Sequence, residues 1–203
     1  KESFVRQGIK SSLCTVVHNG IDISIIPAVP PDKIRQELGI KEDETVIGSV
    51  GSLVKRKRFD DLINVVAHLR TQNLPTACLP VRQGQAGTEH RQQTTDNPPI
   101  PPLTKGGEGG FLNKIKCLIV GDGPEKETLQ EEINKNGLDN IIILTGFKSD
   151  AISYINAMDI FILPSEREGF PRVILEAMLT GKPIVASKAA GSVELVIDKE
   201  TGF

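Results

Sequence analysis

The chain has 203 residues, enough for one ordinary domain and too few for two large ones, and its formal net charge is −2. This balance argues for neither nucleic acid nor an acidic partner, and no segment approaches the roughly 20 apolar residues that span a bilayer. Cys14, Cys78 and Cys117 are scattered without the spacing of a metal or redox site, so we expect free thiols in a reducing, cytoplasmic setting.

The two ends of the chain are typical of a piece of a longer protein. The first residue is Lys1 rather than Met, and Phe203 directly follows a Thr-Gly turn. We expect residues 1–22 to be the remnant of a preceding helix followed by an interdomain hinge. His18 in this hinge has no carboxylate partner in the sequence, so a structural role is favoured over general base catalysis.

Residues 23–203 alternate between short apolar runs and amphipathic segments, which predicts strands alternating with helices. The expected strands and helices, in chain order, are Pro30–Leu38 (helix), Thr45–Gly51 (strand), Phe59–Leu69 (helix), Ile115–Val120 (strand), a helix from Pro124 to about Asn136, Ile141–Leu144 (strand) and Ala151–Ala157 (helix, capped by Ser149 or Asp150). This alternation predicts an α/β fold, a Rossmann-like three-layer domain around an open parallel sheet.

A basic loop, Lys55 to Arg58, lies between the end of a predicted strand and the start of a helix. Three interpretations compete for it. A solvated loop needs no further explanation, and a nucleic-acid or membrane patch would be small and would lack interleaved aromatic residues. A diphosphate clamp is favoured, because cations at the carboxyl end of a strand meet a phosphate there.

The apolar periodicity disappears over residues 73–112, which are rich in Pro, Gly, Gln and Thr. Such a composition buries too little surface to offset the entropy of ordering it. We interpret this segment as a disordered insertion in a surface connection, which a fold tolerates at little closure cost. Glu89 and His90 fall within it, and we assign them no metal role.

The stretch from Asp159 to Ser187 predicts a complete strand-loop-helix-strand unit. A strand over Ile160–Leu163 leads to a polar loop that ends at Phe170. A helix then begins at Pro171 and ends at Gly181, because Pro suits a first helical turn and Gly suits the left-handed backbone that ends a helix. A further strand over Pro183–Ala186 completes the unit. In parallel sheets, ligands gather in the crevice beyond the carboxyl ends of the strands, where this loop lies.

Two glutamates mark that loop and the helix after it. Glu168 lies just ahead of the helix and Glu176 lies in its second turn, so both carboxylates are predicted to face one crevice. The buried stripe of the same helix is assigned to Val173, Ile174, Ala177 and Met178. Two carboxylates beside an amide-rich helix start suit a ligand that carries both sugar hydroxyls and phosphate.

The run from Glu168 to Met178, with its continuation Gly181–Ser187, resembles the Glu-x7-Glu motif of retaining family 4 glycosyltransferases of the GT-B fold. The resemblance implies that the first glutamate, Glu168, contacts the donor sugar and that the second, Glu176, binds the ribose. It also implies that the backbone after the first glutamate holds the sugar and diphosphate, which assigns the donor-binding residues Gly169, Phe170, Pro171 and Val173.

Other parts of the chain resemble the same family. Gly51, Leu53 and Lys57 match a pattern of Gly-Arg-Leu, three variable residues and Lys-Gly, but Ser52 replaces the arginine and Arg58 the glycine. The resemblance makes Lys57 the phosphate ligand, with Arg56 or Arg58 supplying the missing cation. The remaining donor-binding residues that it implies are Ser52 in the first pattern, Gly121 and Gly123 in a Gly-Asp-Gly-Pro turn, and Phe147 beside the nucleotide base.

Without the family, the Gly121–Gly123 turn is weak evidence for a dinucleotide site, because a third glycine on the helix is missing. Asp122 in this turn has an alternative role as a helix cap. An NAD-dependent oxidoreductase is therefore disfavoured. A paired-carboxylate hydrolase is disfavoured because both glutamates are assigned to binding.

The resemblance implies one half of a GT-B enzyme, a domain that binds a nucleotide-diphosphate sugar and takes part in glycosyl transfer with retention of configuration. Glu168 and Lys57 are its implied catalytic residues, and no metal or other cofactor is expected. The acceptor, a glycan or lipid-linked molecule, is expected to bind through an absent amino-terminal domain, with peripheral contact to the inner face of a membrane. The alternative is a non-catalytic or degenerate nucleotide-binding fragment.

Overall fold

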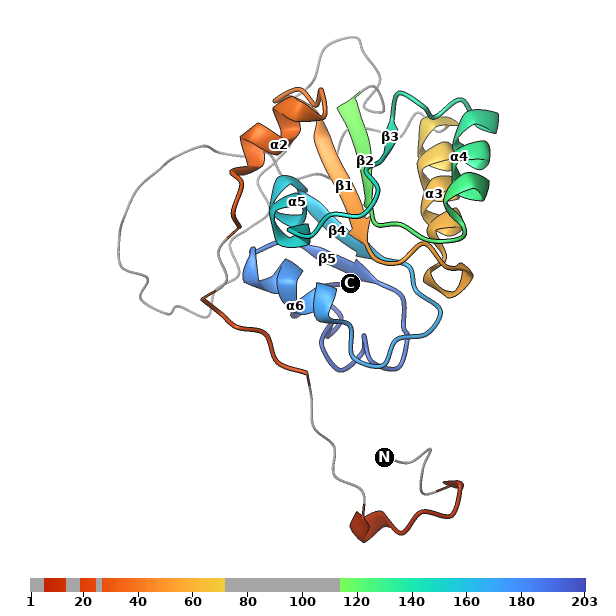
Figure 1. The fold of residues 1–203 in the computed structure, drawn as a ribbon, viewed down its shortest axis with the longest axis vertical. Coiled ribbons are helices and arrows are strands. Elements are labelled where there is room, and N and C mark those ends of the chain that lie inside the picture. Colours follow the sequence, from red (N-terminus) through yellow and green to blue (C-terminus); the bar gives the residue numbers. More distant parts are fainter. Residues whose placement is uncertain (1–5, 14–18, 25–26, 72–113) are drawn as a thin grey trace.

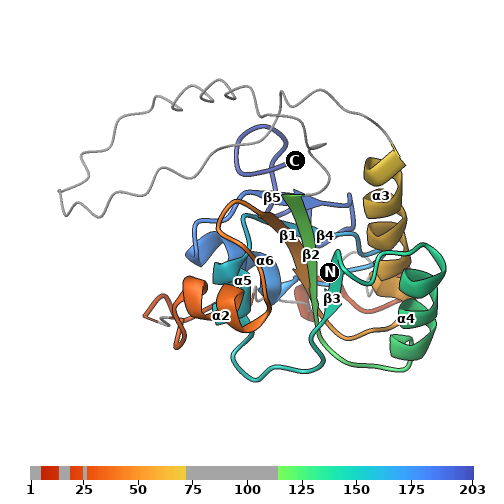
Figure 2. The ribbon, with the colours of Figure 1, turned by 90° about the horizontal axis from the view of Figure 1, so that it is seen from above.

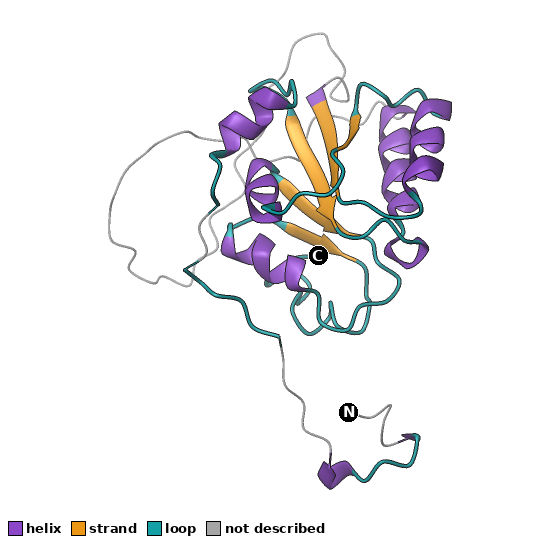
Figure 3. Cartoon of the chain, in the orientation of Figure 1, coloured by secondary structure: helices purple, strands orange, loops and turns teal. Residues whose placement is uncertain are grey.

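A five-stranded parallel sheet forms the centre of the protein, which we describe from a computed structural model (Figures 1 and 3). The structure describes residues 6–13, 19–24, 27–71 and 114–203. The strands lie in the order β3-β2-β1-β4-β5, and every pair of neighbours is parallel. Their bounds are Thr45–Val50 for β1, Ile115–Val120 for β2, Ile142–Leu144 for β3, Ile160–Leu163 for β4 and Ile184–Ala186 for β5.

Helices cover both faces of the sheet, which gives three layers (Figures 1 and 2). One face carries α3 and α4, and the other carries α2, α5 and α6. The helices are α2 (Pro31–Glu37), α3 (Phe59–Thr71), α4 (Lys126–Lys135), α5 (Ala151–Ala157) and α6 (Arg172–Leu179), with the short 3-10 turns η1 (Ser11–Leu13) and η2 (Lys55–Lys57).

The central strands β1 and β2 are mostly apolar because each has two buried faces. Successive side chains of a strand point to opposite faces. On β2, Cys117 and Ile119 therefore pack in the α3/α4 layer, while Leu118 and Val120 pack in the α2/α5/α6 layer. Gly48 on β1 makes room for a neighbour, because a β-carbon at this position would lie 2.8 Å from the sulfur of Met158.

A buried arginine fastens α2 to the amino ends of β1 and β4. Arg35 is 5% exposed, and its guanidinium donates to the carbonyl of Ala157 at 2.9 Å and to the carboxylate of Asp159 at 2.6 Å. The same carboxylate accepts the amide of Val46 on β1 at 2.8 Å. These bonds lie at the edge of the sheet opposite the predicted site, so we assign them a structural role.

The predicted fold class and most predicted elements are confirmed. Three details differ. Pro171 flanks α6 rather than opening it. The segment after residue 190, which in sequence resembles the family's glycine-serine turn and the helix that follows it, is a series of turns. Asp122 does not cap α4, because its carboxylate binds the amide of Gly123 and the ammonium of Lys126 instead. The predictions for His18, Cys14, Cys78, Glu89, His90 and the 73–112 insertion lie outside the described residues.

Within the described residues, no helix has both the length and the apolar character needed to cross a membrane.

We predict that Cys117 is chemically inert in the folded protein. Its side chain is fully buried on β2, and this burial raises the pKa of the thiol to about 12. Because the thiolate is the reactive form, iodoacetamide at pH 8 should leave Cys117 unmodified in the native chain and should label it in urea. Mass spectrometry of the peptide that carries Cys117 measures this, and rapid labelling of the native chain would contradict the β2 placement.

Candidate functional site

The connections of β1 and β4 leave the sheet toward opposite faces, although the two strands are neighbours. The loop after β1 leads to α3 on one face, and the loop after β4 leads to α6 on the other (Figure 1). Loops that diverge in this way open a crevice at the carboxyl ends of a parallel sheet, and this position is where such folds bind ligands. The predicted site residues of both loops lie here.

An ion pair joins the two loops across this crevice. Lys57 ends η2, Glu168 lies between β4 and α6, and the Lys57 ammonium lies 2.5 Å from the Glu168 carboxylate. The side chains are only 13% and 8% exposed. Gly51 lies beside the lysine, since a β-carbon there would be 3.6 Å from Cε of Lys57. The structure thus brings together Gly51, Lys57 and Glu168.

Hydrogen bonds connect the loops that follow all five strands. From the β3 side to the β1 side, Gly121 donates its amide to the carbonyl of Gly146 at 3.0 Å, and Leu53 donates to Asp122 at 2.9 Å. The loops after β4 and β1 are linked by the amide of Glu166, which donates to the carbonyl of Arg56 at 2.8 Å. Two bonds link the loops after β5 and β4. The amide of Gly191 donates to the carbonyl of Glu168 at 3.1 Å, and the Ser187 hydroxyl donates to the carbonyl of Ser165. The site is therefore built on mutually supported loops.

Three glycines permit these close approaches. A β-carbon at Gly121 would lie 1.9 Å from the carbonyl oxygen of Gly51, and one at Gly123 would lie 2.5 Å from that of Leu53. A β-carbon at Gly191 would lie 2.0 Å from the carbonyl oxygen of Gly169. Real β-carbons do not approach backbone atoms this closely, so only glycine fits these positions. Sequence reasoning placed Gly191 in a turn but did not predict this packing, because its contact is with a loop 22 residues away.

The loop from Glu168 to Phe170 is also held by Asn19, from the segment that precedes the sheet. The side-chain amide of Asn19 donates to the carbonyl of Phe170 at 3.2 Å. The sequence predicted Asn19 to lie in the hinge but did not predict this contact. The backbone expected to hold a sugar diphosphate is therefore fixed by contacts from Gly191 and Asn19.

The amino-terminal end of α6 follows directly on this loop. Pro171 is its flanking residue, and no side chain caps the helix there. The first-turn amides have no partner within a helix, which makes such an end favourable for anions. Glu176 lies in the second turn, where partial burial of its carboxylate raises its pKa and the nearby Arg172 lowers it.

Four other predicted donor-binding residues take no part in the ion pair. Ser52 is exposed. Arg58 binds Asp61 on α3, with Nε 2.7 Å from the carboxylate. Phe147 is 75% exposed. It directly follows Gly146, whose carbonyl links the loops after β2 and β3. Val173 packs against the core of the α2/α5/α6 layer.

A cavity of about 500 Å³ lies at the edge of β5, beside the crevice. It includes Ser187, Lys188, Ser192 and Phe203 in its lining, and none of the predicted site residues lines it. Among the described residues, no group of three or more His, Cys, Asp or Glu side chains is arranged to hold a metal ion.

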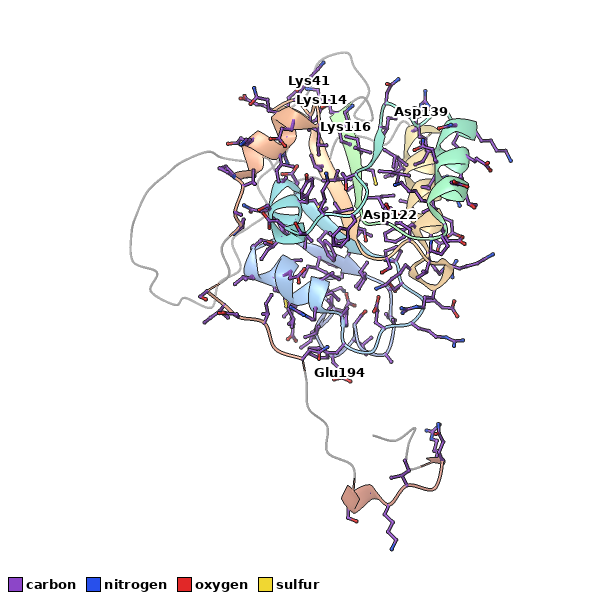
Figure 4. All side chains as sticks on the ribbon, viewed as in Figure 1. Lys41, Lys114, Lys116, Asp122, Asp139 and Glu194 are labelled. Atoms are coloured by element: carbon purple, nitrogen blue, oxygen red, sulfur yellow. The ribbon has the colours of Figure 1, made fainter. Side chains whose placement is uncertain are left out.

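The charged residues at the opposite edge of the sheet form a separate group. Figure 4 shows Lys41, Lys114 and Lys116 gathered where β1 and β2 begin, whereas Asp122 lies toward the carboxyl ends of the strands. Lys114 lies 3.1 Å from Asp43, and Lys116 lies 3.6 Å from Glu44. Lys114 and Lys116 are thus paired with acidic residues, and this group of lysines lies away from the crevice.

Comparison with known proteins agrees with this geometry. Residues 111–203 match the model of the family described as "Glycosyl transferases group 1". The structure of HepE from Anabaena, solved in complex with UDP and glucose, superimposes with a TM-score of 0.72 and 28% identity, over 100% of this chain and 46% of HepE.

Two curated relatives align along most of the chain. N-acetyl-alpha-D-glucosaminyl L-malate synthase of Bacillus anthracis is 24% identical over 92% of this chain and 39% of its own length. Lipopolysaccharide 1,2-N-acetylglucosaminetransferase of Salmonella typhimurium is 25% identical over 100% of this chain and 45% of its own length. The chain thus spans less than half of the length of these relatives.

The fold and the crevice define a Rossmann-like domain of the kind found in GT-B glycosyltransferases. Its carboxyl-terminal part, residues 111–203, is similar to the group 1 glycosyl transferases.

Replacement of Gly191 by alanine tests whether loop packing supports the site. The added β-carbon would meet the Gly169 carbonyl at 2.0 Å, so we expect Gly191→Ala to lower the free energy of unfolding by about 1–3 kcal/mol. Gly169→Ala is the matched control, because nothing lies within 4 Å of its β-carbon. Urea denaturation followed by circular dichroism measures both, and equal stabilities would show that the two loops do not touch.

The raised pKa of Glu176 predicts a pH-dependent stability difference. Burial penalises the ionised carboxylate, so Glu176→Gln, which mimics the protonated form, should be at least as stable as the natural chain at pH 7. Because the folded-state pKa is raised, this advantage should fade as the pH falls through that value and vanish below the ordinary value of 4.5. Denaturation of both chains between pH 3.5 and 8 measures it, and a less stable variant at pH 7 would refute the assignment.

Proposed function

We propose that this chain is the donor-binding part of a retaining family 4 glycosyltransferase, which transfers a sugar from a nucleotide-diphosphate sugar to an acceptor. The observation that carries the proposal is the Lys57–Glu168 ion pair. It brings the basic loop after β1 and the Glu-x7-Glu segment after β4 into one crevice, at the point where this fold class binds nucleotides. The match of residues 111–203 to the group 1 family supports it.

Each loop supplies one part of the donor site in this proposal. Lys57, with Arg56 or Arg58 and the first-turn amides of α6, holds the diphosphate. Glu168 binds hydroxyls of the donor sugar and Glu176 binds those of the ribose. The backbone at Gly51, Gly121, Gly123, Gly169 and Phe170 permits close approach of the ligand, and exposed Phe147 lies beside the base.

The chemical step breaks the bond between the anomeric carbon and the diphosphate, and the electron pair leaves with the diphosphate. Stabilising that leaving group is the main task of the site, because negative charge develops on it. We assign this task to the Lys57 ammonium and the amides at the start of α6 rather than to a metal ion. Retention means that the new bond forms on the face of the sugar from which the diphosphate departs.

We place the acceptor site in a domain that precedes this one, because the chain spans less than half of its relatives. The chain alone should therefore bind nucleotide and transfer sugar poorly. The relative from Salmonella that is named for lipopolysaccharide supports a glycan or lipid-linked acceptor. Such an acceptor would place the whole enzyme in the cytoplasm, in peripheral contact with the inner face of a membrane.

Calorimetric titration with UDP, GDP, ADP and dTDP tests the donor site. We expect one of the four to bind, and Lys57→Met to weaken that binding by on the order of 10-fold or more, since a hydrogen bond to a charged group contributes about 1.5–3 kcal/mol. Lys55→Met is the matched control, because Lys55 lies in the same turn but is exposed. Excess EDTA should leave the dissociation constant unchanged.

Two outcomes would count against the proposal. No heat with any of the four nucleotides would favour the alternative, a degenerate fragment, which the exposed Ser52 in place of an arginine also favours. Loss of binding in EDTA would overturn the assignment of charge stabilisation to Lys57 and the α6 amides.

A further inference from the structure

We infer that Glu168 competes with the donor diphosphate for Lys57, and that this competition makes the site favour a nucleotide sugar over the free nucleoside diphosphate. The inference rests on the proposed function and concerns the same crevice. It assigns Glu168 a role in specificity that comes from its contact with Lys57, in addition to any contact with sugar hydroxyls.

The geometry makes the two anions alternatives for one cation. The Lys57 ammonium donates a charge-assisted hydrogen bond to Oε1 of Glu168, with the two atoms 2.5 Å apart. A diphosphate bound by the same ammonium must displace this carboxylate or share its partner. The Lys57 ammonium is the more mobile member of the pair, because it is carried on a flexible four-carbon stem, which here runs alongside the side-chain-free Gly51.

The Glu168 carboxylate, in contrast, is attached to a fixed backbone. Its own carbonyl accepts the amide of Gly191, and two residues earlier Glu166 donates its amide to Arg56. The Gly191 contact leaves no room for a β-carbon between the loops. When Lys57 turns toward a diphosphate, the Glu168 carboxylate therefore remains in place.

Leaving the Glu168 carboxylate in that position without Lys57 costs free energy unless the carboxylate gains new hydrogen-bond donors. The Glu168 side chain is 8% exposed, and a nearly buried charge without a partner loses hydration that nothing replaces. The hydroxyls of a donor sugar supply such hydrogen-bond donors, whereas a free nucleoside diphosphate has no sugar at this place. The change of partner therefore costs more for the free diphosphate, and the Lys57–Glu168 pair re-forms as that product leaves.

The variant Glu168→Gln separates the two effects. Glutamine keeps the length of the side chain and an oxygen that accepts from Lys57, but removes the negative charge. We expect it to bind the nucleoside diphosphate identified above on the order of 10-fold more tightly than the natural chain. The glucose conjugate of the same nucleotide should gain less, because Glu168 also serves the sugar, so the preference for the nucleotide sugar should fall.

Two controls assign the effect to Lys57. Glu166→Gln removes the same charge two residues away from a side chain that is 54% exposed, and it should change binding by less than about twofold, because exposed charges are screened. In the Lys57→Met background, Glu168→Gln should no longer strengthen binding, because the competing pair is already absent.

Calorimetry with UDP, GDP, ADP and dTDP and their glucose conjugates, with circular dichroism to verify folding, distinguishes the outcomes. If the natural chain binds a nucleotide and Glu168→Gln binds it no more tightly, the proposed competition for Lys57 is wrong, but the proposed donor site is retained. The same holds if the gain persists without Lys57. If no nucleotide binds the natural chain, both the proposed donor site and the proposed competition are wrong. Should Glu168→Gln fail to fold, Glu168→Asp, which retracts the charge by one methylene, should give a smaller gain of the same sign.

Discussion

The close approach of backbone to backbone at the carboxyl edge of the sheet is the constraint on which the rest of the site depends. Lys57 and Glu168 are 111 residues apart in sequence and belong to different loops. They meet because Glu166 binds the carbonyl of Arg56 and because Gly191 packs on the backbone of Gly169. A side chain at Gly191 would push the β4 loop away, and the ion pair would open without any change in its own two residues.

The parallel sheet explains why these loops share one edge. Its strands all run in one direction, so their following loops gather at one end. Burial on both faces fixes the strands, and therefore the loops, since a slip by one residue would move each buried side chain to the wrong layer. On β2, such a slip would exchange Leu118 with a neighbour from the α3/α4 layer. The core thereby supplies the precision that the crevice requires.

The elements that could be predicted from the sequence are those that a local residue pattern determines. The strand Ile115–Val120 was predictable because a short, mostly apolar run that ends at a glycine-rich turn is typical of a buried strand. The turns after residue 190 were not, because the family resemblance implied a helix there, while Gly191 packs against a distant loop. Asn19 and Gly191 had no local signal for their contacts. The family resemblance placed Lys57 and Glu168 in one donor site but did not predict their ion pair, since spacing alone does not specify contacts between loops.

Ser52 and Arg58 depart from the family pattern, and these departures increase the dependence of the proposed site on the Lys57–Glu168 pair. Arg58 keeps the left-handed backbone that the family's glycine would favour, with φ of 53°, so the loop retains its path despite the substitution. Its guanidinium binds Asp61, and Ser52 brings no charge where the pattern has an arginine. The positive charge nearest to Glu168 in this structure is thus that of Lys57. A site that depends strongly on one ammonium is sensitive to whatever shares that ammonium, and the residue that shares it is the glutamate assigned to the sugar.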